Sequence, residues 1–141
     1  EAESRGLQFV PLPQEVAAAL KSSPKLAAAG INVGSYLDIP DVSVPKWQAA
    51  ADVLSRYDYA DMYLFVIADP FPGVENVIID YAAKIDAPVA VAYMGGGEAE
   101  KAGRLAMQTA GIPVYPTPER AARGLAALAW YAQYRRDSNN A

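Results

Sequence analysis

Short apolar runs separated by longer helical patterns dominate this chain. Residues 64–67 and 89–92 are continuous apolar runs bounded by turn residues, a pattern typical of strands buried on both faces of a parallel sheet. Residues 112–115 predict a third, shorter strand. Residues 7–10 follow Gly6, where a helix formed by residues 1–5 could end, and predict an additional strand.

Helical patterns lie between these runs. Ser43 predicts the N-cap of a helix that begins near Val44, with an apolar stripe formed by Trp47, Ala50, Ala51 and Leu54. Thr117 and Pro118 predict the start of the longest helix, over residues 118–135. Its buried stripe is predicted to comprise Ala121, Ala122, Leu125, Leu128, Ala129 and Ala132. Further helices are predicted over residues 14–20, 73–84 and 97–109.

Alternation of strands with helices of this length predicts right-handed crossovers and a parallel sheet that is covered on both faces. The 141 residues are 52% hydrophobic, which suffices for one core and not for two. We therefore expect a single α/β domain over residues 1–136, followed by a disordered polar tail over residues 137–141.

Composition excludes several classes of function. A net charge of −4 supplies no basic surface for nucleic acid, and no run approaches the roughly 20 apolar residues that span a bilayer. No signal-peptide pattern stands at the start, so we expect a cytoplasmic protein. The chain has no cysteine and no histidine, which removes thiolate and imidazole chemistry.

The loops after the predicted strands are the places where open α/β sheets bind ligands. Asp69 follows the first buried strand and could bind a metal or accept a proton, but a single carboxylate favours a helix cap or a turn. Gly95, Gly96 and Gly97 follow the next strand and could let the backbone approach an anion. They match neither a P-loop nor a dinucleotide fingerprint, and the pattern favours a tight strand-to-helix turn over an anion site.

A long connection over residues 31–39 carries Asn32, Gly34 and Asp38 at a place where a plain crossover needs few polar groups. Long ordered loops are often functional, so these three residues are candidates for a binding site. Ser35 lies outside any nucleophile-elbow pattern and has no imidazole base, which excludes a serine hydrolase. Three aromatic residues at helical spacing near the chain end indicate core or interface packing: Trp130, Tyr131 and Tyr134.

Several segments in succession resemble one known family. They are GLQFVPL over residues 6–12, the loop from Asn32 to Asp38, the strand that leads into Asp69, PVAVAYMGG over residues 88–96, and AGIPVYPTPERAA over residues 110–122. This order resembles the C-terminal ligase-CoA domain of ADP-forming (NDP-forming) acyl-CoA synthetases, in the succinyl-CoA synthetase superfamily. The resemblance covers nearly the whole chain and is sharpest in its last third.

The resemblance implies a flavodoxin-like fold of three layers, with helices on both faces of a parallel sheet. It implies a part of an enzyme that converts an acid, CoA and ATP to an acyl-CoA, ADP and phosphate through a phosphohistidine. CoA, ATP or ADP and Mg²⁺ belong to the whole enzyme, and none is expected to bind this chain alone. The implied partners are a CoA-binding domain that bears the histidine and a nucleotide-grasp domain. Asn32, Asp38 and Gly95 to Gly97 would contact phosphate or the interface.

Two departures limit the resemblance. The family domain begins with a strand, a glycine loop and a helix, whereas this sequence starts inside or after that helix. We therefore expect the first strand to come from another chain or fragment, and the isolated chain to be poorly stable. The family's Asn-Pro-Val-Asp loop is matched only loosely by residues 32–38. The alternative is a non-catalytic module for acyl-CoA sensing or assembly, as in acetyltransferase-type or regulatory proteins.

Overall fold

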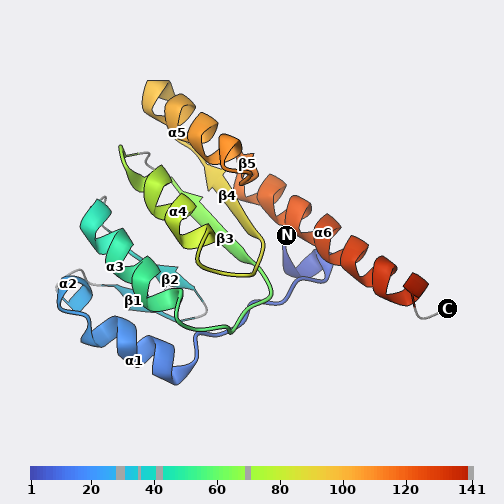
Figure 1. Cartoon of the computed structure of the whole chain (residues 1–141), viewed down its shortest axis with the longest axis horizontal. Helices are drawn as coiled ribbons and strands as arrows, with labels where there is room; N and C mark the ends of the chain where they lie inside the picture. Colours follow the sequence, from blue (N-terminus) through green and yellow to red (C-terminus); the bar gives the residue numbers. More distant parts are fainter. Residues whose placement is uncertain (28–30, 35, 41–42, 69–70, 140–141) are drawn as a thin grey trace.

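Three parallel strands form the centre of the structure, in the order β3–β4–β5 (Figure 1). They are β3 (Tyr63–Ile67), β4 (Val89–Tyr93) and β5 (Val114–Tyr115). The register pairs Tyr63 with Val89 and Val91 with Val114. This computed structural model describes residues 1–27, 31–34, 36–40, 43–68 and 71–139. All three strands predicted between residues 64 and 115 are confirmed as members of one parallel sheet.

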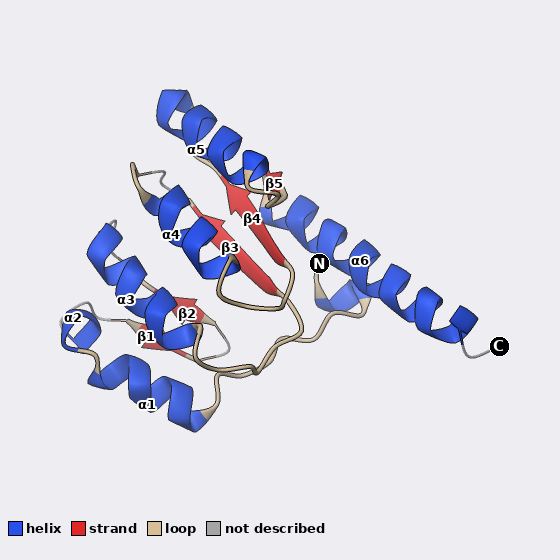
Figure 2. Cartoon of the chain, viewed as in Figure 1, coloured by secondary structure: helices blue, strands red, loops and turns tan. Residues whose placement is uncertain are grey.

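Helices cover both faces of this sheet (Figure 2). On one face pack α3 (Val44–Leu54), α4 (Val74–Ala82) and α5 (Gly97–Thr109), with α4 between α3 and α5. The long α6 (Pro118–Asn139) contacts all three strands on the other face. The two faces differ in side-chain size, since Val89, Val91 and Tyr93 of β4 join the main core whereas Ala90 and Ala92 face α6. The chain is therefore a three-layer α/β fold.

The first third of the chain builds a small subassembly beside α3. It consists of α1 (Gln14–Ser22), α2 (Pro24–Ala27) and an antiparallel hairpin of β1 (Asn32–Val33) and β2 (Leu37–Asp38). A short 3₁₀ turn (Glu3–Arg5) precedes them and lies beside α6, where Glu1 pairs with Arg123 (Figure 1). α1 and α2 pack against each other and against α3. They contribute three fully buried side chains to the core, namely Val16, Leu20 and Leu26.

Helix boundaries follow the local signals in the sequence. α3 begins at Val44 with Ser43 at the N-cap, although the Ser43 side chain makes no capping hydrogen bond. The N–H of Arg120 donates to Thr117 Oγ1 at 3.4 Å, so Thr117 caps α6. Gly6 ends the N-terminal turn with φ 82°, a left-handed conformation that favours glycine.

The strand predicted over residues 7–10 is absent. These residues are irregular, and no strand in the described part of the chain pairs with them. Phe9 is 59% exposed and Val10 43% exposed. A strand needs a neighbour to satisfy its backbone groups, and local apolar character cannot supply one.

α6 is longer than predicted and only half buried. It continues to Asn139, so residues 137–139 are helical where a disordered tail was expected, and Gln133 Nε2 donates to Asp137 Oδ1 at 2.7 Å within this last turn. Ala121, Ala122 and Leu125 are buried, as predicted, whereas Leu128 is 42% exposed and Ala132 is also exposed. The apolar stripe continues along α6 farther than the sheet does (Figure 1). Within the described residues, no helix has the length and apolar character that a bilayer crossing requires.

Candidate functional site

The loop between β4 and α5 carries the glycine run singled out in the sequence. Gly95, Gly96 and Gly97 have φ of 110°, 77° and 85°, all in the left-handed region that side chains other than glycine rarely adopt. Gly96 combines this φ with ψ of −178°, a conformation essentially restricted to glycine. The three glycines are therefore required by the backbone of this turn, and α5 begins immediately at Gly97.

An acidic side chain of α5 folds back onto this glycine loop. The N–H of Gly96 donates to the carboxylate of Glu100, and Arg104 Nη2 donates to the same carboxylate from one turn further along α5. These bonds, that from Arg104 foremost, hold the pKa of Glu100 below its ordinary value. The positive end of the α5 dipole thus already has an anion, which belongs to the chain itself.

Arg104 also joins the carboxyl ends of two strands. Its Nη2 donates to the carbonyl oxygen of Tyr93 at 3.1 Å, and its Nη1 donates to the carbonyl oxygen of Val114 at 3.4 Å. One guanidinium therefore links β4, β5 and Glu100. Sequence reasoning did not select Glu100 or Arg104; the only available signal was their i,i+4 spacing in the first turns of the helix after the glycines.

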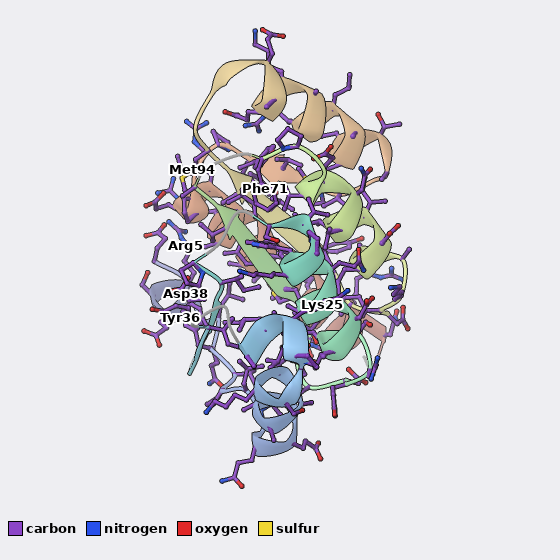
Figure 3. The ribbon with its side chains drawn as sticks, turned by 90° about the vertical axis from the view of Figure 1, so that its left-hand side faces the viewer. Arg5, Lys25, Tyr36, Asp38, Phe71 and Met94 are labelled. Carbon is purple, nitrogen blue, oxygen red and sulfur yellow. The ribbon has the colours of Figure 1, made fainter. Side chains whose placement is uncertain are left out.

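The candidates Asn32, Gly34 and Asp38 belong to the hairpin and not to a long loop. The register places Asn32 opposite Asp38. The N–H of Gly34 donates to the carbonyl oxygen of Tyr36 at 3.2 Å, which closes the turn. Asp38 and Tyr36 are exposed and lie together at the margin of the molecule, as Figure 3 shows. Pairing of the two short strands explains the structure of a segment that looked too long for a plain connection.

The third candidate loop follows β3. Asp69 lies outside the described residues, so its prediction as a metal ligand, proton acceptor or cap has no structural counterpart here. Phe71, in the same loop, is buried and packs edge-to-face on Trp47 with ring centroids 5.8 Å apart. Figure 3 shows Phe71 near Met94, which precedes the glycine loop, so the loops after β3 and β4 lie at the same end of the sheet.

The candidate residues thus form two separate groups. Among the described residues, no hydrogen bond or ion pair joins the hairpin to the loop of Gly95 to Gly97. The described part of the chain also contains no group of three or more acidic side chains placed to hold a metal ion. The chain contains no histidine and no cysteine, so the arrangement has no imidazole base and no thiol.

Two cavities lie away from the glycine loop. One of about 320 Å³ lies at the amino ends of β4 and β5, opposite the end where α/β folds bind ligands, beneath α6. It is lined by Pro88, Val89, Ala90, Gly111, Pro113, Tyr115, Gly124, Leu125 and Leu128. The other, of about 220 Å³, lies between the N-terminal segment, α6 and β3. It is lined by Glu1, Ala2, Glu3, Phe9, Leu64, Pro118, Glu119 and Ala122.

The second cavity adjoins an unpaired sheet edge. β3 pairs with β4 on one side through Tyr63, Phe65 and Ile67, and within the described residues no strand pairs with its other side. Leu64 and Val66, which alternate with those residues, direct their backbone groups to that other side. Val66 is 46% exposed although it lies in the middle of an apolar strand. The edge of β3 is therefore an open apolar template for pairing.

Comparison with known proteins identifies no relative: no protein-family model matches the chain, and neither a curated protein nor a solved structure matches it.

Proposed function

We propose that this chain is the ligase-CoA-like part of an ADP-forming acyl-CoA synthetase, with a flavodoxin-like fold that lacks its first strand and glycine loop. In this role it forms one wall of a phosphohistidine site and a subunit interface, and it breaks no bonds itself. The observation that carries the proposal is the open edge of β3 beside the 220 Å³ cavity. In the family that the sequence resembles, the first strand of the domain lies next to the strand that corresponds to β3.

A strand added at this edge would satisfy the backbone of Leu64 and Val66. The helix that accompanies such a strand would cover the exposed side chains of Phe9 and Val66. We assign both elements to another chain or fragment of the synthetase. The open edge therefore explains why residues 7–10, apolar enough for a strand, have no pairing partner here.

The proposed phosphate contact is the loop of Gly95, Gly96 and Gly97. A phosphoryl group approaching this loop would meet the positive end of α5 and backbone N–H groups. At Gly96 it would compete with the carboxylate of Glu100, which already accepts that N–H. Asn32, Gly34 and Asp38 of the hairpin are assigned to the interface, because they lie apart from the glycine loop.

The described residues contain no group of three or more acidic side chains that could hold a cation by themselves. Mg²⁺, CoA and the nucleotide therefore belong, in this proposal, to the other parts of the synthetase. The same holds for the phosphorylated histidine, because this chain has none.

The first test is the mass of the native protein before and after denaturation. The proposal predicts a complex that separates into the 15.0 kDa chain and a different, larger polypeptide. Incubation with ATP should then phosphorylate a histidine of the larger polypeptide only. A stable, folded protein that contains nothing except copies of this chain would contradict the synthetase assignment.

A pair of glycine variants tests the phosphate contact in that complex. Gly96→Ala forces a side chain into a left-handed conformation within the loop, and we expect at least a tenfold slower phosphorylation of the partner's histidine. Gly111→Ala is the matched control, because Gly111 has φ 83° and equally open surroundings but follows the other end of α5. Equal rates for both variants would remove the glycine loop from the site.

The second candidate is a non-catalytic module for acyl-CoA sensing or assembly. The bond between Gly96 and Glu100 favours it, since a loop that already holds an internal anion needs no phosphate to be stable. This candidate predicts that the larger polypeptide contains an acetyltransferase domain and that ATP phosphorylates neither chain.

A further inference from the structure

The outer face of α6 carries an ordered series of exposed side chains. Arg123, Ala127, Trp130, Tyr134 and Asp137 follow one another at intervals of four, three, four and three residues. This is the spacing of a coiled-coil seam, which keeps a single stripe of a helix directed at a partner helix. Positions at these intervals lie on one face of α6.

This seam faces away from the sheet. The residues that anchor α6 to the sheet are Ala121, Ala122 and Leu125, which are buried on a different side of the helix. In contrast, Trp130 is 68% exposed and Tyr134 is 57% exposed. Their rings stack with centroids 5.6 Å apart and planes 15° apart. The stacked pair therefore forms an apolar surface exposed to solvent, on a part of α6 that extends beyond the sheet (Figure 1).

Charge along the seam selects the direction of a partner. Arg123 stands at one end and Asp137 at the other, about 21 Å apart at 1.5 Å per residue. Arg123 Nε donates to Glu1 Oε1 at 3.0 Å, and its side chain is 59% exposed, so it remains accessible to another carboxylate. A parallel copy would place like charges together, whereas an antiparallel copy places each arginine near the partner's aspartate.

We propose that α6 binds a second copy of this chain through this seam, as an antiparallel helix pair with two-fold symmetry. In this arrangement Arg123 lies level with Asp137 of the other copy, which places Trp130 level with Trp130 at the two-fold axis and the small side chain of Ala127 level with Gln133. The pairing is isologous, because the same stripe serves both copies. The sheet of each copy stays on the far side of its own helix.

The length of the seam sets the strength of the pairing. One helix stripe about 21 Å long buries less than the roughly 800 Å² per partner of a standard interface. The homodimer is therefore weak, with a dissociation constant on the order of micromolar. Trp130 and Tyr134 at its centre do not line the cavity beside the β3 edge, although Arg123 bonds to Glu1, which does. The pairing does not depend on the synthetase proposal.

Sedimentation velocity of the protein as purified, over roughly 1 to 300 µM to bracket the affinity expected for a small interface, tests the pairing. The unmodified protein should show self-association that doubles its mass. Arg123→Asp and Asp137→Arg should each raise the dissociation constant at least tenfold. The combined variant, with both charges reversed, should recover the original constant, because the opposite charges meet again.

Two controls separate the seam from general effects. Arg135→Asp makes the same change in charge as Arg123→Asp away from the seam and should leave the dissociation constant unchanged. Trp130→Ala should abolish association while circular dichroism shows the same helix content. The recovery in the combined variant also excludes loss of the bond to Glu1 as the cause, since Asp137→Arg does not restore that bond.

Three results would overturn the proposal. They are a constant mass per copy over the whole concentration range, single charge reversals that leave association unchanged, and a different protein bound to Trp130 in place of the second copy.

Discussion

At the scale of single residues, the glycine loop is stabilised by the side chains that follow it. The N–H of Gly96 and the guanidinium of Arg104 both donate to the carboxylate of Glu100. Glycine can adopt the backbone angles of this loop, but it loses more conformational entropy on folding than other residues do. The acidic and basic side chains of α5 therefore hold the loop in one conformation when no ligand is present.

The charge of Glu100 gives this contribution a defined pH dependence. Its pKa is lower in the folded chain than its ordinary value of 4.5, so the folded state favours the ionised form. The resulting stability is fully present above the unfolded pKa and is lost as the pH falls through the folded pKa. We expect Glu100→Gln to lower the melting temperature at pH 7, and the difference from the unmodified chain to shrink between about pH 5 and pH 3.

Thermal melts of both proteins across this pH range measure the effect. Glu98→Gln is the control, because Glu98 pairs with Lys101 on the exposed surface and its side chain is 88% exposed. A difference for Glu100→Gln that stays constant to pH 3 would show that its charge does not act on folding.

At the scale of elements, close packing of helices on the sheet depends on two glycines. A methyl group at Gly103 of α5 would lie 2.9 Å from Cε1 of Tyr93, which is only 1% exposed. A methyl group at Gly124 of α6 would lie 2.1 Å from the hydroxyl of Tyr115, which is half-buried. Both glycines let a helix approach a tyrosine ring of the sheet.

The two sites differ in how far the tyrosine can move. Gly103→Ala should destabilise the chain, because overpacking costs about 1–3 kcal/mol and the gain in helix propensity returns about 1 kcal/mol. Gly124→Ala should cost less despite the shorter distance, because the end of Tyr115 can turn toward solvent. Urea unfolding of both variants provides the comparison, and a larger loss for Gly124→Ala would contradict it.

Elements defined by local signals could be predicted from the sequence. α5 covers the predicted residues 97–109, and the N-cap at Thr117 has the expected hydrogen bond, because caps and helical periodicity act over a few residues. The segment 7–10 and the hairpin could not be predicted in the same way. Whether an apolar segment pairs depends on a neighbour that is distant in the sequence.

In the candidate site, too, local features could be predicted and long-range contacts could not. The run of Gly95 to Gly97 stands out in the sequence, and glycine is the residue that the backbone angles of this loop demand. The role of Arg104 could not be predicted, because it depends on carbonyl oxygens of Tyr93 and Val114 in two separate strands. Asn32 and Asp38 were found as a pair of polar residues, but only the register of the hairpin places them opposite each other.

At the scale of the whole molecule, protection of backbone amides from hydrogen exchange should decrease from the centre of the sheet to its open edge. β4 is buried along its whole length and paired on both sides, whereas among the described residues β3 is paired on one side only. Amide hydrogen exchange should therefore be slow at Tyr63, Phe65 and Ile67 and fast at Leu64 and Val66. NMR of the chain as purified measures this alternation.

Binding of a strand at the open edge would remove the alternation. We expect slow exchange at Leu64 and Val66 when the larger polypeptide of the proposed synthetase is present. Uniform protection along β3 in the chain alone would mean that its second edge is already paired.

The two tryptophans lie in different environments, so intrinsic fluorescence can follow two different events. Trp47 is half-buried against Phe71 and Phe65, with ring centroids 5.8 and 6.5 Å away, so we expect its emission at the shorter wavelength of an apolar environment. Trp130 stacks on Tyr134 in contact with water, so we expect it to emit at longer wavelength than Trp47. Unfolding of the core and covering of the outer helix face therefore shift the spectrum in opposite directions, so one cuvette distinguishes the two events without a label.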